Sequence, residues 1–300
     1  MKENTPKGVA YAVATAVIAS TAAASTKLIA VDVPVPMIVL VQYSICLVVM
    51  LPWLLRNGSG VLKTQRPAAH LMRGLTGWLC FYVYYLALAH IPLVDATLLR
   101  NTGPLFVPLA IWLWLKVVIP RKSWGPMILG FCGVLLILRP QFNGINPWHI
   151  VGLLSGFFLA FSMVGTRTLS TTEPSSLILF YYFAISFLCS LPLAIANWQA
   201  IPLWTLPWLA YVGLSIFITM WLYTQAYTWA KATVVAPVNY LGVVFAGFLG
   251  WLMWGHVPDT VALSGMVLVV GAGLLSIYLG ATASRQKTGS SVSKQTVSSG

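Results

Sequence analysis

The sequence carries little charge, and negative charge is especially scarce. Only 7% of the 300 residues are charged, and five Asp and Glu stand against 17 Lys and Arg. Because a water-soluble domain covers its surface with polar side chains, a chain with 59% hydrophobic residues is not an ordinary soluble protein. Apolar stretches follow one another from Val9 to Ala281 with short polar breaks. We therefore expect lipid to surround most of the chain.

Residues that build metal sites, disulfides and catalytic centres are also few. The four cysteines lie inside apolar stretches without paired spacing, and the four histidines are scattered near different stretch ends. This pattern predicts no disulfide framework, no metal site and no cofactor. The sequence contains no Gly-rich phosphate loop, no nucleophile elbow and no cluster of His, Asp or Glu within a span. We therefore do not expect an enzyme.

Ten apolar stretches are long enough, or nearly so, to cross a hydrocarbon layer, which takes roughly 20 helical residues. They do not alternate in polarity as barrel strands do, so helices that satisfy their own backbone hydrogen bonds are expected. The predicted fold is thus an all-α integral membrane protein with ten transmembrane helices. The predicted spans are 9–30, 37–55, 71–89, 94–115, 123–138, 150–168, 177–196, 206–229, 234–254 and 261–281.

The net charge is +12, and the basic residues are distributed unequally between the two sides of the membrane. This distribution argues against nucleic acid as a partner. If the N-terminus is cytoplasmic, fourteen of the 17 basic residues, Arg73 among them, fall on the cytoplasmic side. Arg139 alone falls in an outer loop, and Lys27 and Arg100 lie within apolar stretches. The positive-inside bias therefore predicts a multi-pass protein of the cytoplasmic (inner) membrane with both termini in the cytoplasm.

An internal repeat links the two halves of the chain. A shift of 140 residues places Lys27 on Arg167 and Pro34 on Pro174, and further proline, glycine and aromatic matches follow. Five spans per half is an odd number, so the second copy enters the membrane from the opposite side. Inverted repeats of this kind are typical of secondary transporters that bind substrate near the midplane. A duplicated scaffold without transport would give the same matches.

The repeat predicts the organisation of the chain. Residues 1–140 form the first five-helix repeat and residues 141–282 the second. The remaining segment, 283–300, is rich in Ser, Thr, Lys and Gln, and we expect a disordered cytoplasmic tail.

Arg100 is the most informative candidate for a site residue. It lies about six residues, or roughly 9 Å of helix, inside the predicted span 94–115. A charge at such a depth by default faces a cavity or a partner, and its planar donors suit a carboxylate or phosphate. The alternative is that the side chain reaches back to the outer headgroups.

The second repeat is polar at the same place, since Asn239 and Tyr240 align with Arg100 and Asn101. Prolines beside these positions predict kinked helices, and kinked paired helices with adjacent polar groups indicate a binding site. The predicted kinks are at Pro104, Pro108 and Pro237.

Aromatic side chains are further candidates. Trp78, Tyr82 and Tyr85 share one helical face and are the best aromatic candidates for lining a cavity, although any single one of them fits an interfacial belt as well. No Asp or Glu lies deep in a span, which argues against a carboxylate proton relay and favours a zwitterionic or anionic ligand.

Several motifs resemble the drug/metabolite transporter superfamily, EamA type, over essentially the whole chain. The segments are Ile91-Pro-Leu-Val-Asp-Ala-Thr, Gly103-Pro-Leu-Phe, Gly130-Phe-Cys-Gly-Val-Leu-Leu-Ile-Leu-Arg-Pro140, Ala232 to Pro237 and Gly265 to Leu275. Arg73-Gly-Leu and the Gly130 run look like the branch that includes bacterial S-adenosylmethionine carriers. The chain departs from many members, which carry a Glu shortly after the fourth and ninth spans.

The resemblance implies two inverted five-helix repeats around a central cavity, and export or exchange of amino acids and related metabolites. Combined with the residues above, it predicts a carrier of small polar metabolites, monomeric or homodimeric among membrane lipids, in which two halves rock around the site. A carrier of S-adenosylmethionine or a nucleotide-like metabolite is the nearest alternative. A lipid-headgroup flippase or a non-transporting scaffold is the alternative of another class.

Overall fold

The computed structural model describes residues 5–117, 121–138, 146–229, 238, 240–275 and 278–279. Throughout these residues the regular structure is helical, which confirms the all-α class. The α-helices are α1 (Thr5–Ile29), α2 (Val35–Asn57), α3 (Pro67–His90), α4 (Leu93–Arg100), α5 (Gly103–Leu115), α6 (Arg121–Leu138), α7 (Pro147–Leu169), α8 (Ser175–Ala196), α9 (Leu206–Trp229) and α11 (Leu241–Trp254), followed by Thr260–Leu275. Short 3₁₀ helices lie at Ser59–Leu62 and Leu203–Thr205.

Six helical segments of the described chain are long and apolar enough to cross a membrane. They are Pro6–Ile29, Val35–Asn57, Leu93–Leu115, Pro147–Leu169, Ser175–Ala196 and Leu203–Ala226. Three shorter apolar helices lie at Trp124–Leu136, Leu241–Trp254 and Thr260–Leu275. α3 is 24 residues long but less apolar, because it contains His70, Arg73 and three tyrosines. The count of ten transmembrane helices stays a prediction.

Proline marks the start of many of these helices. Its ring fixes φ near the helical value, and its missing N–H is not needed in the first turn. Pro67 and Pro147 are the first residues of α3 and α7, and Pro34, Pro92 and Pro174 are the N-caps of α2, α4 and α8. The chain therefore breaks where the apolar stretches meet, and successive helices turn back on one another.

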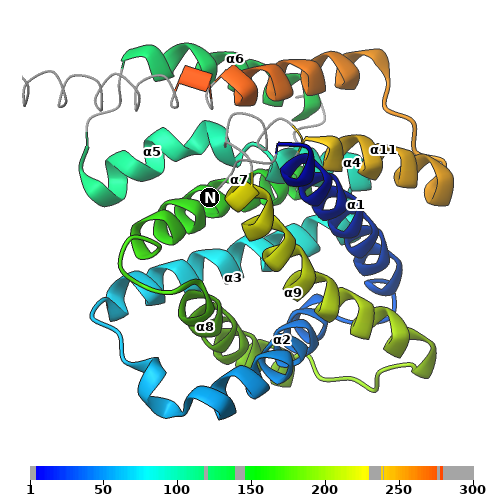
Figure 1. The fold of residues 1–300 in the computed structure, drawn as a ribbon. Helices are drawn as coiled ribbons and strands as arrows, with labels where there is room; N and C mark the ends of the chain where they lie inside the picture. Colours follow the sequence, from blue (N-terminus) through cyan, green and yellow to red (C-terminus); the bar gives the residue numbers. More distant parts are fainter. Residues whose placement is uncertain are drawn as a thin grey trace, which may run out of the picture.

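Eight helices contact one another in a closed ring. Following the contacts, the order is α3, α7, α4, α11, α1, α9, α2, α8 and back to α3 (Figure 1). α5 packs against α7 outside this ring, and α6 packs against α5. The main buried core joins residues of α1 to α4 with residues of α8, α9 and α11. The ring brings both halves of the sequence together along its whole circumference.

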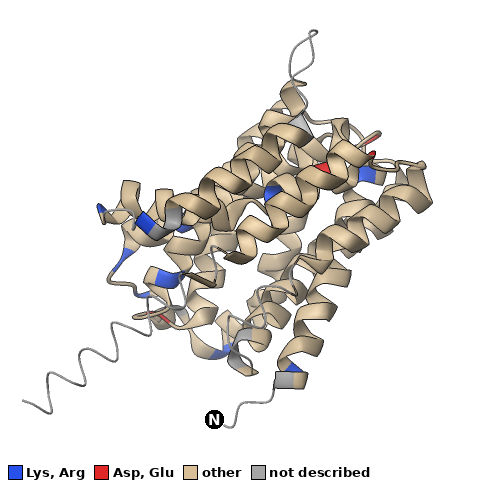
Figure 2. Ribbon diagram, turned by 90° about the horizontal axis from the view of Figure 1, so that it is seen from above, with Lys and Arg blue, Asp and Glu red and all other residues tan. Residues whose placement is uncertain are grey.

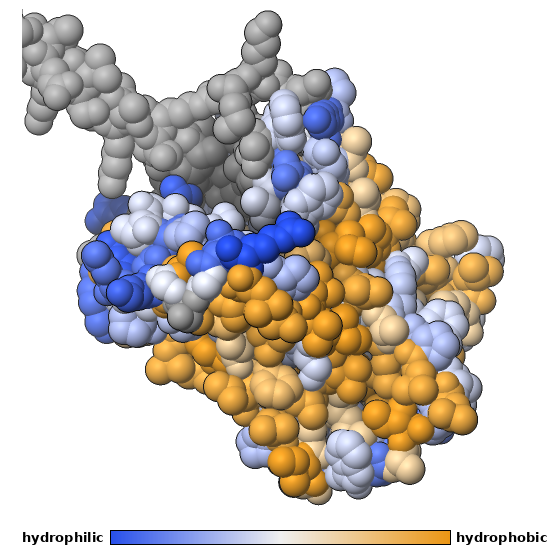
Figure 3. Space-filling model, turned by 60° about the horizontal axis from the view of Figure 1, so that its bottom comes forward, coloured by the Kyte–Doolittle hydropathy of each residue, from blue (hydrophilic) through white to orange (hydrophobic). Residues whose placement is uncertain are grey.

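The surface matches a lipid environment. Large apolar side chains such as Val48, Leu188, Val244 and Val267 are more than half exposed. In the space-filling view a broad apolar surface is bordered by hydrophilic residues (Figure 3). Most Lys and Arg lie toward the end of the bundle where the N-terminus lies (Figure 2). A multi-pass membrane protein follows, while the side that faces the cytoplasm stays a prediction.

The fourth predicted span is interrupted near its middle. α4 ends at Arg100 and α5 starts at Gly103, within the apolar segment Leu93–Leu115. Arg73, which the charge pattern assigns to the cytoplasmic side, lies two turns into α3 and has only 6% of its surface exposed.

Candidate functional site

The break between α4 and α5 positions Arg100. Pro104 has no N–H, so it cannot donate to the carbonyl of Arg100 as the fourth residue along a continuous helix would. Thr102 instead donates its hydroxyl to the carbonyl of Leu99 at 2.6 Å. α7 passes close to the break at Gly156, where a Cβ would lie 2.6 Å from that same carbonyl. A glycine on α7 thus lets the interrupted backbone pack against it.

The Arg100 side chain lies against α3. Its guanidinium carbon is 4.6 Å from the ring centre of Phe81 and 5.0 Å from that of Tyr84. The Nε atom is buried and has no hydrogen-bond partner, and no carboxylate of the described residues pairs with the guanidinium. The aromatic faces stabilise the cation in part. Its donors face α3 instead of extending along the helix toward the headgroups.

Arg73 is a second buried cation on α3. Its Nε donates to the Thr166 hydroxyl of α7 at 2.5 Å, and its guanidinium carbon lies 4.1 Å from the ring centre of Tyr182 on α8. The Nη1 atom is buried without a hydrogen-bond partner, and within the described chain no carboxylate pairs with this arginine either. Arg73 therefore joins α3, α7 and α8 while leaving donors unused.

α2, α3 and α8 carry further buried hydroxyl and amide groups. The Tyr43 and Tyr182 hydroxyls are 2.8 Å apart, and Tyr85 donates to Gln42 Oε1 at 2.5 Å. Gln42 is fully buried, yet its Nε2 has no hydrogen-bond partner. Unsatisfied buried donors are costly and usually indicate an absent partner.

The aromatic residues predicted for the site occupy two places. Trp78 and Tyr82 stack with ring centres 5.4 Å apart, and Trp78 donates to Ser190 at 2.8 Å. Tyr85 turns instead toward Gln42 of α2 and is 2% exposed. The side of α3 that meets Arg100 carries Phe81 and Tyr84, which the sequence argument had not selected.

The second interrupted helix approaches the first. Gly247 and Gly250 of α11 lie opposite Val94 and Leu93 of α4, so the two helices run antiparallel.

Tyr240 is the N-cap of α11 and is 7% exposed. Its hydroxyl has no hydrogen-bond partner in the described chain and lies against Gly273. The remaining predicted residues are Asn101, the partly buried C-cap of α4, Pro104 in the first turn of α5 and Pro108 inside α5. Asn239 and Pro237 lie outside the described residues.

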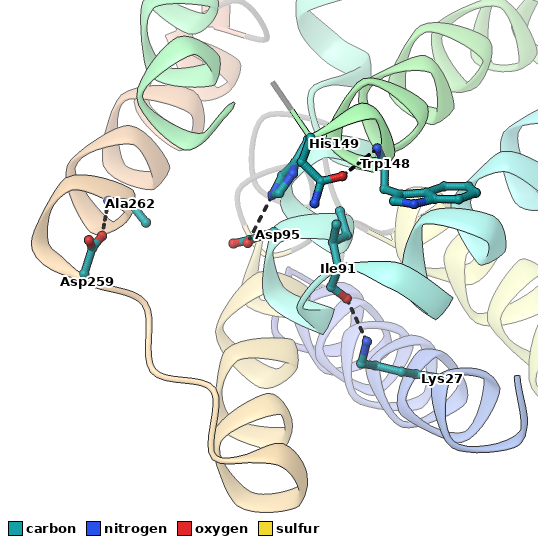
Figure 4. A network of polar contacts seen from close by, with 8 residues as sticks. Lys27, Ile91, Asp95, Trp148, His149, Asp259 and Ala262 are labelled. Carbon is teal, nitrogen blue, oxygen red and sulfur yellow. Dashed lines mark hydrogen bonds and ion pairs between the residues drawn. The ribbon is translucent and has the colours of Figure 1, made fainter. Parts of the chain in front are cut away.

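A separate polar cluster joins the ends of α1, α3, α4 and α7 (Figure 4). Lys27 donates to the carbonyls of Leu88 and Ile91 at 2.7 Å each. Asp95 lies 3.6 Å from His149 Nε2. Asp95 therefore pairs with α7, while Arg100, five residues along, lies on another face.

Four residues near the site were not predicted as site residues from the sequence: Arg73, Gln42, Tyr43 and Tyr182. One signal was present for Arg73, which falls inside the predicted span 71–89 and has the same depth argument as Arg100. No sequence signal marks Gln42, Tyr43 or Tyr182, because the burial of a Gln or Tyr side chain depends on tertiary contacts that its position in the chain does not reveal.

Comparison with known proteins identifies related chains. The family model described as the EamA-like transporter family matches residues 6–139 and again residues 146–278. A pseudopaline exporter, CntI, from Pseudomonas aeruginosa (strain UCBPP-PA14) is 35% identical over 227 residues, covering 74% of this chain and 80% of its own. An S-adenosylmethionine uptake transporter from Rickettsia bellii is 28% identical over 77% of this chain and 79% of its own.

A riboflavin transporter from Vibrio cholerae is 29% identical, covering 79% of this chain and 80% of its own. A solved crystal structure superposes with a TM-score of 0.60 at 19% identity, covering 92% of this chain and 99% of its own. The relatives are transporters of different small metabolites, and the superposed structure shares the fold.

Proposed function

Because the chain belongs to the EamA-like transporter family, we propose that it is a secondary transporter that exports or exchanges small metabolites bearing a carboxylate, amino acids or related zwitterions among them. The observation that carries this proposal is Arg100. Its guanidinium is held at a helix break against two aromatic rings, with a buried donor unused and no carboxylate of the described residues beside it. A substrate carboxylate supplies the missing partner.

The interrupted helices support binding at this place. In transporters, substrate sites form where helices break near the midplane, because freed backbone groups and helix ends face the ligand. Arg100 and Asn101 lie at the end of α4, and Tyr240 is the N-cap of α11, the helix that packs against α4. Asn239 is adjacent in sequence to Tyr240, so we include it with Arg100, Asn101 and Tyr240 in the proposed site.

The helix contacts support alternating access. In the two repeats 1–140 and 141–282, α1 corresponds to α7, α2 to α8, α3 to α9 and α5 to α11. The contact between α3 and α7 therefore has a counterpart between α9 and α1. In the same way the contact of α3 with α8 corresponds to that of α9 with α2, and the contact of α5 with α7 to that of α11 with α1. An internal twofold axis produces such a correspondence, and a twofold axis in the membrane plane lets one structure open alternately to the two sides.

A second candidate substrate class is a nucleoside-like metabolite. Two related proteins are named for S-adenosylmethionine and riboflavin. The stacked pair of Trp78 and Tyr82, both partly exposed, offers an aromatic face for a planar ring. We therefore place Trp78 and Tyr82 in the proposed cavity lining, whereas Tyr85, which donates to Gln42, has a separate position in the interior.

The test is counterflow in proteoliposomes, in which labelled amino acids, S-adenosylmethionine and riboflavin are each offered outside vesicles loaded with the same compound in unlabelled form. Saturable uptake of carboxylate-bearing substrates is expected. Hydrogen bonds to charged groups contribute about 1.5–3 kcal/mol, so Arg100→Gln should weaken binding about 10- to 150-fold.

Arg56→Gln is the matched control, because Arg56 is exposed at the end of α2. Circular dichroism and size-exclusion chromatography establish that each variant is folded. Unchanged affinity in folded Arg100→Gln would contradict the role of Arg100, and uptake of riboflavin alone would favour the second class.

A further inference from the structure

One face of α3 carries both arginine contacts. Arg73, Gly77, Cys80 and Tyr84 are spaced by three or four residues, so they lie along a single side of the helix, and all four are buried. The guanidinium of Arg73 lies beside Gly77, because a Cβ there would overlap its Nη1 atom. The guanidinium of Arg100 lies higher on the same side, against Phe81 and Tyr84.

The two guanidinium groups are close but distinct. From the level of Gly77 to that of Phe81 is four residues, or roughly 6 Å along the helix axis. The buried Cys80 lies between Gly77 and Tyr84 on this side of α3. The two guanidinium groups contact different aromatic rings: that of Arg73 lies against Tyr182, and that of Arg100 lies against Phe81 and Tyr84. The site therefore offers two separate positions for negative charge.

Neither position is neutralised by the described protein. Taking a cation out of water is costly unless an opposite charge or several hydrogen bonds replace the water. Arg73 uses one donor, on Thr166, and its buried Nη1 has no partner; the buried Nε of Arg100 has none either. Two such cations in one interior, with no described carboxylate on either, favour a ligand that brings negative charge.

We propose that Arg73 and Arg100 together bind a substrate with two separated carboxylates, one for each guanidinium. This inference rests on the proposed function, because it places the first carboxylate at Arg100. The planar fork of each arginine pairs with a carboxylate through two hydrogen bonds. The roughly 6 Å offset along α3 matches a dicarboxylate with a short carbon chain between its acid groups.

The experiment compares ligands of equal size that differ by one charge. Competition for counterflow is measured with L-glutamate against L-glutamine, and with succinate against succinamate. Glutarate and adipate extend the distance between the carboxylates, and glycerol 3-phosphate offers two charges on one group. Wild type should prefer each dicarboxylate to its monoamide by tenfold or more.

Arg73→Gln should weaken the binding of glutamate and succinate more than that of glutamine and succinamate, so that the preference for the dicarboxylate is lost. Arg73→Lys keeps the positive charge but loses the planar pair of donors, so it should retain part of the preference for the dicarboxylate. Because a buried variant can misfold, ligand-induced thermal stabilisation of the wild type provides a second measurement, and succinate should stabilise it more than succinamate.

The outcomes separate the two proposals. Equal binding of glutamate and glutamine, both lost in Arg100→Gln, would overturn the second carboxylate position and leave the proposed function standing. Binding of neither, by folded protein, would overturn the proposed function itself. Competition by glycerol 3-phosphate as strong as that of the best dicarboxylate would overturn the assignment of two separate groups.

Discussion

Gly77 of α3 provides a sharp test of the packing around Arg73. In Gly77→Ala the new Cβ would lie 2.7 Å from Cε2 of Tyr182 and would overlap Arg73 Nη1. Cβ atoms essentially never come within 3.0 Å of another side chain, so both neighbours must move. The guanidinium is the far end of a flexible side chain and can turn away, whereas Tyr182 is 1% exposed, with its hydroxyl 2.8 Å from that of Tyr43, and has little room to shift.

The expected magnitude follows from two opposing effects. Forcing a methyl group into a packed interior costs about 1–3 kcal/mol. Replacing glycine by alanine within a helix stabilises the folded protein by about 1 kcal/mol, because alanine has the higher helix propensity. Gly271→Ala, in the helix Thr260–Leu275, isolates the second effect, because a Cβ there would meet no atom within 4 Å. Relative to this control, Gly77→Ala should therefore be less stable by about 1–3 kcal/mol.

The assay is thermal unfolding of the purified variants in detergent, followed by loss of the monodisperse size-exclusion peak, with glutamate and glutamine competition measured in parallel. Gly77→Ala should melt below Gly271→Ala and should lose the preference for glutamate. If it melts with the control and keeps that preference, Arg73 does not occupy the space beside Gly77, and the reasoning fails.

Two further substitutions test the interior. Tyr43→Phe leaves the buried Tyr182 hydroxyl without its 2.8 Å partner and should cost about 1–3 kcal/mol in thermal unfolding; unchanged stability would mean that the hydroxyl pair is not formed. In Gly133→Ala the Cβ would lie 2.8 Å from a backbone oxygen of the facing helix, which cannot rotate away, so α6 should separate from it with a similar loss relative to Gly271→Ala. A Gly133→Ala melting temperature equal to that of Gly271→Ala would show that these helices are not in close contact.

The fold class could be read from the sequence because lipid imposes a simple rule. Helices satisfy their own backbone, and their apolar length is visible residue by residue. The predicted stretch 150–168 lies within α7, Pro147–Leu169. The break after Arg100 was less visible, because a proline permits either a kink or a complete interruption. Close packing of α7 at Gly156 accommodates the interruption, and such a contact has no sequence signature.

The candidate site was predictable only where charge revealed it. Arg100 stands out in an apolar stretch, and the structure places its donors inside the bundle. Arg73 carries the same charge but lies near the end of its stretch, where basic residues are usually solvated. Gln42 and Tyr182 acquire their roles from helices distant in sequence, through tertiary contacts alone.

The order of helices around the ring determines which parts of the molecule can move together. α3 packs most extensively against α7, and α1 against α9, so the strongest contacts join helices from different halves of the chain (Figure 1). Any unit held rigid by these contacts is therefore a mixture of the two repeats. A rocking motion of units defined by these two contacts would therefore cut across the two halves of the sequence rather than follow them.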